Sequence, residues 1–113
     1  MRGQVGAAGA RALALAALLA CAGGEERGLS EPALRGQAVY RNVCIACHAA
    51  DPRQDGALGP AIAGSSLELL EAKVLRGEYP PGHAPKRPTL SMPAFAYLED
   101  DLPALAAYLS EVR

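Results

Sequence analysis

The feature that most constrains this 113-residue chain is one pentapeptide, Cys44-Ile45-Ala46-Cys47-His48. Residues three and four apart share a face of a helix, so a helical segment places Cys44 beside both Cys47 and His48. Two thiols one turn apart can add to two vinyl groups of a single porphyrin, and the histidine that follows can point its imidazole at the iron. The run C-x-x-C-H is the attachment signature of c-type haem. We therefore expect one covalently bound haem c, with His48 as an iron ligand.

Three other interpretations use part of the same pentapeptide. A disulfide between Cys44 and Cys47 suits an exported protein, and a thioredoxin-like dithiol has the same spacing but belongs to a βαβ context that this chain lacks. A zinc ion could use Cys44, Cys47, His48 and His83. Adjacent Cys47 and His48 are poorly placed to bind one ion tetrahedrally. Only haem attachment uses every position of the pattern.

The second iron ligand is predicted from the few methionines and histidines that the sequence contains. Apart from Met1, which leaves with a predicted signal peptide, Met92 is the only methionine, and His83 is the only histidine besides His48. Pro93 disfavours helical dihedral angles at Met92 and keeps it in an extended loop. That loop is stiffened by Pro80, Pro81, Pro85, Pro88 and Pro93. We predict that Met92 binds the iron; the alternatives are a methionine that only fills the core and a bis-histidine iron with His83.

The first 20 residues are predicted to be a signal peptide. Arg2 and Arg11 accompany an apolar run over residues 12–20 that is followed by small residues, the usual layout of a secretory signal. Leu18-Leu19-Ala20-Cys21 resembles a bacterial lipobox, with cleavage before a lipidated Cys21. The same residues also fit ordinary cleavage after small residues. We expect an exported protein, periplasmic or on the outer face of the cytoplasmic membrane, that is lipid-anchored at Cys21 through a glycine-rich tether over residues 21–30.

Composition excludes two classes of protein. The chain carries 11 basic and 12 acidic side chains, so it has no electrostatic basis for binding nucleic acid. It has no apolar window of about 18 residues that could span a bilayer. Its aromatic content is low, with one Phe, four Tyr and no Trp. A bound porphyrin would supply the missing bulk of the core.

Residues 31–113 are predicted to form one all-α domain, because no alternating strand pattern occurs in them. For the first helix, Ser30 is the expected N-cap and Pro32 lies in the opening turn. One face of this helix then carries Gly36, Tyr40, Val43, Cys44 and Cys47.

Two further helices are expected. Ser65 and Glu68 form a capping box for the second, which ends at Gly77. Its predicted apolar face is Leu67, Leu70 and Val74. Acids at residues 99–101 suit the N-terminus of the third helix. The apolar residues of that helix are Leu102, Leu105, Leu109 and Val112.

From about Ala33 to Val112 the chain resembles class I cytochromes c, the monohaem family with histidine and methionine ligands. Four features carry the resemblance: the C-x-x-C-H pentapeptide; the run Met92-Pro93-Ala94-Phe95; Gly59-Pro60 with Gly64 after it; and Gly36 and Tyr40 on the first helix paired with Leu105 and Tyr108 on the last.

The resemblance implies a small cytochrome c fold, with about three to four helices wrapped around one covalently attached haem. It implies that the carbonyl of Pro60 accepts the proton on the other ring nitrogen of His48, which fixes the ring and raises its basicity. It also implies a close crossing of the first and last helices. No Trp is present to bind a haem propionate, and that role is open among Tyr79, Lys86, Arg87 and Tyr97; the loop 49–58 has no assigned role.

The expected function follows from the two protein ligands. With both axial positions filled, oxygen and peroxide have no open site, and the iron suits one-electron transfer. We expect a carrier without a substrate of its own, not an enzyme, whose partners are redox proteins such as a quinol-oxidising complex, a dehydrogenase or a terminal oxidase. The alternatives are an electron-accepting subunit of a larger dehydrogenase or oxidase, and a gas-binding haem sensor or enzyme.

Overall fold

The computed structural model describes residues 28–88 and 91–113. The predicted signal peptide, Cys21 and most of the predicted tether lie outside the described residues. Within them the chain forms helices and no strand, so the prediction of an all-α domain is confirmed. No helix among the described residues is both long and apolar enough to cross a membrane.

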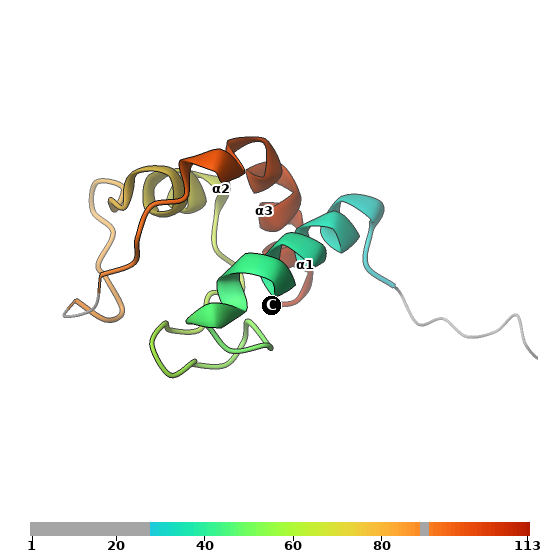
Figure 1. Ribbon diagram of the computed structural model, residues 1–113, viewed down its shortest axis with the longest axis horizontal. Helices are drawn as coiled ribbons and strands as arrows, with labels where there is room; N and C mark the ends of the chain where they lie inside the picture. The colour runs from blue at the N-terminus through green and yellow to red at the C-terminus, as the bar shows by residue number, and fades with distance from the viewer. Residues whose placement is uncertain (1–27, 89–90) are drawn as a thin grey trace, which may run out of the picture.

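Helix α1 spans Glu31–Val43 and continues into a short 3₁₀ segment, η2, at Cys44–Ala46 (Figure 1). Its start is as predicted. The Ser30 hydroxyl accepts a hydrogen bond from the backbone N–H of Ala33 at 3.3 Å, and a proline lies in the first turn. The C-x-x-C-H segment therefore begins directly at the C-terminal end of α1.

Helix α2 spans Leu67–Leu70 and runs into a π-helical turn, η3, at Glu71–Leu75. The predicted cap is wrong by one residue. The Ser66 hydroxyl caps the helix by accepting from the N–H of Leu69 at 3.1 Å, while the Ser65 hydroxyl points back into the preceding turn and donates to the carbonyl of Ile62 at 2.6 Å. Leu67 is then the first helical residue and is 39% exposed, so it does not belong to the buried face.

The expected end of this helix is present. Gly77 follows it with a φ of 67°, a left-handed conformation that suits glycine beyond a helix C-terminus. Of the predicted apolar face, Leu70 and Val74 are buried.

Helix α3 spans Leu102–Glu111 and follows a 3₁₀ segment, η4, at Ala96–Asp101. The acids predicted for its N-terminus lie in η4 instead, and none of their side chains caps α3. Pro103, in the first turn, needs no backbone donor there. The buried side chains of α3 include Leu102, Leu105 and Leu109, as predicted, while Val112 is partly buried at the C-cap.

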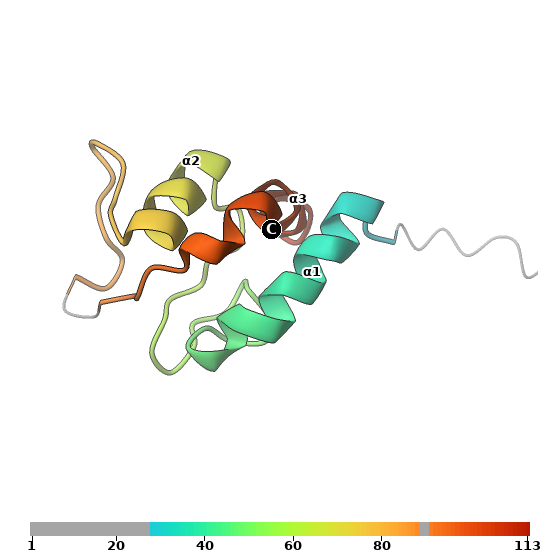
Figure 2. The same ribbon diagram turned by 45° about the horizontal axis from the view of Figure 1, so that its top comes forward.

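Helices α1 and α3 cross in close contact, and this crossing is the centre of the core (Figure 2). A Cβ on Gly36 would lie 2.0 Å from the carbonyl oxygen of Ala104, so only glycine permits the approach. One turn further along, the rings of Tyr40 and Tyr108 pack with centroids 5.6 Å apart. The predicted pairing of the first and last helices is therefore confirmed.

Candidate haem site

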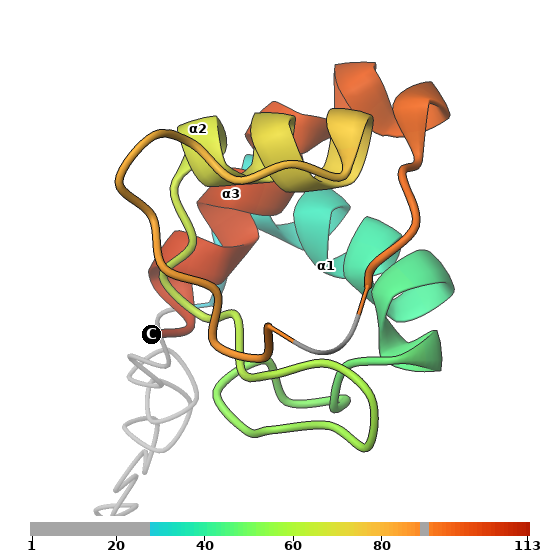
Figure 3. The same ribbon diagram turned by 90° about the vertical axis from the view of Figure 1, so that its left-hand side faces the viewer.

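A cavity of about 530 Å³ opens between the end of α1, the turn after α2 and the loops that follow each of them. This volume falls in the usual range of ligand pockets, about 300–1,000 Å³. Figure 3 shows the surrounding segments, with α2 above, loop 49–62 below and segments 78–88 and 91–95 on either side. The side chains that line it include Cys44, Cys47, His48 and Met92. Apolar wall residues include Leu69, Leu70, Val74, Phe95, Leu98 and Leu105.

The C-x-x-C-H segment is held as one tight turn. The backbone N–H groups of Cys47 and His48 both donate to the carbonyl of Cys44, at 3.2 and 2.9 Å. Both cysteines are free thiols, and burial raises the pKa of the Cys44 thiol to about 11. Within residues 28–88 and 91–113 these two cysteines are not joined and no three metal-binding side chains gather, so neither the disulfide nor the zinc alternative finds support.

The His48 ring is held in place by the backbone of Gly59 and Pro60. Its Nδ1 lies 2.7 Å from the carbonyl oxygen of Pro60, as the resemblance implied. Because a carbonyl only accepts, Nδ1 carries the proton and Nε2 is left free to bind a metal. A Cβ on Gly59 would lie 2.5 Å from both Nδ1 and Cε1, so the ring packs on the bare backbone of this glycine.

Loop 49–58, which had no assigned role, supports the same histidine. A Cβ on Gly56 would lie 2.6 Å from the Cys47 oxygen and from the Ala49 nitrogen. The N–H groups of Leu58 and Gly59 donate to the Cys47 carbonyl at 3.3 and 2.8 Å. Sequence reasoning missed Gly56. Its only signal is a glycine three residues before Gly59, which does not by itself reveal what packs against it.

Met92 lies on a segment tied to the turn after α2. The N–H of Phe95 donates to the carbonyl of Val74 at 2.5 Å, and this carbonyl is free because the helix ends there. Gly77 lies against the backbone of Met92, since a Cβ on this glycine would be 3.8 Å from the Met92 oxygen. The Met92 side chain is partly buried and contacts the core. The fold thus brings Met92 and His48 to one cavity.

Three cationic side chains also line the cavity. The Lys86 ammonium donates to the Ala61 carbonyl at 2.7 Å, and the Arg87 guanidinium lies 4.0 Å from the Asp55 carboxylate. The Arg87 side chain is only 28% exposed although its carboxylate neighbour is 70% exposed. Lys73, the third cation, sits 4.1 Å from the ring centroid of Tyr79.

Of the four candidates for binding haem propionates, Tyr79, Lys86 and Arg87 line the cavity. Tyr97 does not line it, and its side chain is 71% exposed. His83 also lines the cavity, with its ring stacked on Tyr79 at a centroid distance of 5.6 Å and 9° between the planes.

Residues 33–113, which are 81 of the 113 residues, match the family model described as Cytochrome c. The match includes the C-x-x-C-H pentapeptide, Pro60 and Met92. No curated protein and no solved structure matches the chain.

Proposed function

The chain belongs to the cytochrome c family, whose members bind c-type haem covalently and use it for electron transfer, and we propose that it is a class I carrier with His48 and Met92 as axial ligands. The observation that carries this proposal is the shared cavity. Cys44, Cys47, His48 and Met92 all line it, although Met92 is more than forty residues away in sequence.

The residues of the cavity fit a haem. In this proposal Cys44 and Cys47 form the two thioethers, and His48 binds through the nitrogen that Pro60 leaves free. Met92 would supply the second protein ligand, and its thioether favours the ferrous state. The apolar wall of the cavity keeps water away and favours the same state. The haem supplies one-electron redox chemistry when bound, and the two protein ligands leave no position for oxygen or peroxide.

Lys86 and Arg87 are proposed to hold the haem carboxylates. The Arg87 side chain lines the cavity and is half-buried, and its ion pair with the exposed Asp55 carboxylate, at 4.0 Å, is too long for a hydrogen bond. A haem propionate would accept two charge-assisted hydrogen bonds from the Arg87 guanidinium at this position. Lys86, the preceding residue, also lines the cavity and would supply a second positive charge.

The cellular setting is proposed from the sequence alone. Residues 1–20 serve as a signal peptide, Cys21 is lipidated, and residues 21–30 tether a domain of residues 31–113 to the outer face of the cytoplasmic membrane. There the protein exchanges electrons with redox proteins, such as a quinol-oxidising complex, a dehydrogenase or a terminal oxidase, and turns over no substrate of its own.

Export of the full chain with visible spectroscopy and intact mass tests the proposal. We expect a red protein whose mass exceeds that of its polypeptide and acyl groups by one haem, with sharp reduced-state bands. The matched control is the double substitution Cys44→Ser and Cys47→Ser, which leaves Cys21 in place and should give an exported but colourless chain. A colourless wild-type protein would refute the haem site. Rapid carbon monoxide binding by the reduced protein would instead favour a gas sensor or haem enzyme.

A further inference from the structure

Tyr40 packs in the α1–α3 crossing and also makes a hydrogen bond to the segment that carries His48. It is fully buried, and its ring packs against Tyr108 with 55° between the planes. Its hydroxyl donates a hydrogen bond of 2.5 Å to the carbonyl oxygen of Ala49, the residue that directly follows His48. A phenylalanine would give nearly the same packing, so the hydroxyl has a separate role.

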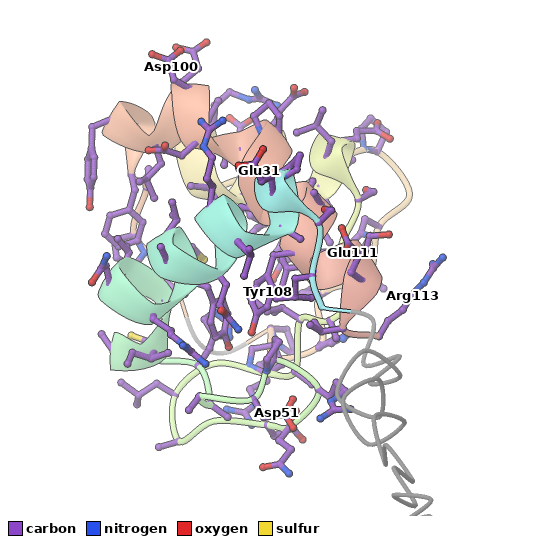
Figure 4. The ribbon with its side chains drawn as sticks, turned by 90° about the vertical axis from the view of Figure 1, so that its right-hand side faces the viewer. Glu31, Asp51, Asp100, Tyr108, Glu111 and Arg113 are labelled. Carbon is purple, nitrogen blue, oxygen red and sulfur yellow. The ribbon has the colours of Figure 1, made fainter. Side chains whose placement is uncertain are left out.

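The hydroxyl remains a donor under all physiological conditions. Burial is the main reason that the pKa of Tyr40 is raised to about 12, and the nearby Cys44, Tyr108 and Asp51 act in the same direction. Figure 4 shows Tyr108 between α1 and the loop that carries Asp51. The Ala49 carbonyl therefore faces a neutral phenol that keeps its proton.

The other restraints on the segment at His48 are local, and they include the bonds from the N–H groups of Leu58 and Gly59 to the Cys47 carbonyl. The His48 N–H bonds within its own turn, to Cys44, while the ring bonds to Pro60 and packs on Gly59 in the following loop. These restraints come from the same turn or from loop backbone. Among the side-chain hydrogen bonds of residues 28–88 and 91–113, that of Tyr40 is the one that joins this segment to the α1–α3 crossing.

We propose that Tyr40 is a positioning residue for the haem histidine: its hydroxyl holds the Ala49 carbonyl and thereby fixes the direction in which the His48 imidazole points. This inference rests on the proposed function, because it takes His48 as the iron ligand. It adds that the helix crossing sets the geometry of that ligand directly.

A consequence for the reduction potential follows. The hydrogen bond from Nδ1 to Pro60 makes Nε2 a stronger electron donor to a bound metal, and a stronger donor stabilises ferric iron. Loss of the Tyr40 hydroxyl leaves the Ala49 carbonyl without this donor, so the segment shifts and the bond from His48 to Pro60 weakens. Tyr40→Phe is therefore expected to raise the reduction potential.

The experiment compares Tyr40→Phe with Tyr108→Phe in the exported haem protein. Both remove one hydroxyl from the same aromatic pair, but no hydrogen bond among the described residues joins Tyr108 to the His48 segment. The measurements are the reduction potential, the paramagnetically shifted proton signals of the His48 ring and haem methyls, and the urea midpoint. We expect the potential to rise and the His48 signals to move in Tyr40→Phe only, whatever the two midpoints do.

Two results would overturn the inference. One is a Tyr40→Phe protein with wild-type potential and His48 signals; the other is a Tyr108→Phe protein that shifts them equally. If Tyr40→Phe does not accumulate, the wild-type protein is measured instead. Its Tyr40 hydroxyl proton is expected to exchange slowly and to show a nuclear Overhauser contact to Ala49. The absence of this contact would also overturn the inference. Haem content is measured first, since a haem-free wild type refutes the proposed function instead.

Discussion

The backbones of Gly36 and Ala104 touch where α1 crosses α3. A Cβ on Gly36 would lie 2.0 Å from the Ala104 oxygen and 2.9 Å from the Leu105 Cα, distances that no relaxed structure tolerates. Gly36→Ala must therefore push the two helices apart. Overpacking in a core usually costs about 1–3 kcal/mol, and we expect the upper end because backbone atoms cannot move aside as a side chain does. The free energy of unfolding from urea titration measures this cost.

Gly28→Ala is the matched control, because nothing lies within 4 Å of a Cβ at that position. Its urea midpoint should equal that of the wild type. A Gly36→Ala protein with an unchanged midpoint would show that the helices do not cross this closely.

A second prediction concerns the glycine behind the haem histidine. Gly59→Ala would place a methyl group 2.5 Å from Nδ1 and Cε1 of His48 and force the ring away from Pro60. Loss of such a partner behind a metal-bound histidine typically costs about 10- to 100-fold in metal affinity or activity. In a protein whose haem is covalently retained, we expect displaced His48 to appear as altered visible and paramagnetic proton spectra.

Gly82→Ala provides the comparison. It adds strain at a φ of 79°, of about 1–2 kcal/mol, but nothing lies within 4 Å of its Cβ and this glycine does not line the cavity. Stability should fall while the spectra stay as in the wild type. Equal spectra for both variants would remove Gly59 from the support of His48.

The identity of the second iron ligand is decided by one pair of variants. Met92→Ala should abolish the weak sulfur-to-iron charge-transfer band of the oxidised protein and lower the reduction potential, because thioether ligation favours ferrous iron. His83→Ala should leave both unchanged, since its ring stacks on Tyr79. The reverse outcome would establish bis-histidine ligation.

Local patterns in the sequence predicted α1 and α3 because each repeats apolar residues on one face. The cap of α2 could not be assigned in the same way. Ser65 and Ser66 are both suitable caps, and the choice depends on the hydrogen bond from Ser65 to Ile62, which belongs to the preceding turn. The π-helical turn after α2 likewise has no distinct sequence signature.

The residues of the candidate site were predictable where a short motif names them, as for the C-x-x-C-H run and Met92-Pro93. The contributions of Gly56 and of the Tyr40 hydroxyl were not. Each depends on a backbone atom of residues 47–49 that becomes a neighbour only after the chain has folded. A pattern along the chain does not report such contacts.

The last prediction concerns acid stability and the junction between the N-terminal end of α1 and the C-terminal end of α3. The Glu111 carboxylate accepts hydrogen bonds from the N–H and the hydroxyl of Ser30, at 2.9 and 2.5 Å, and these bonds hold its pKa below the usual 4.5. Because the folded state favours the ionised form, this stabilisation is complete above about pH 4.5 and is lost as the pH falls through the lowered folded pKa. Glu111→Gln should therefore have a lower urea midpoint than the wild type at pH 7, with the gap closing toward pH 3. Glu71→Gln removes an exposed carboxylate that makes no hydrogen bond within the described part of the chain, and it should show no gap at pH 7. A gap for Glu111→Gln that stays constant from pH 7 to pH 3 would mean that ionised Glu111 does not hold Ser30.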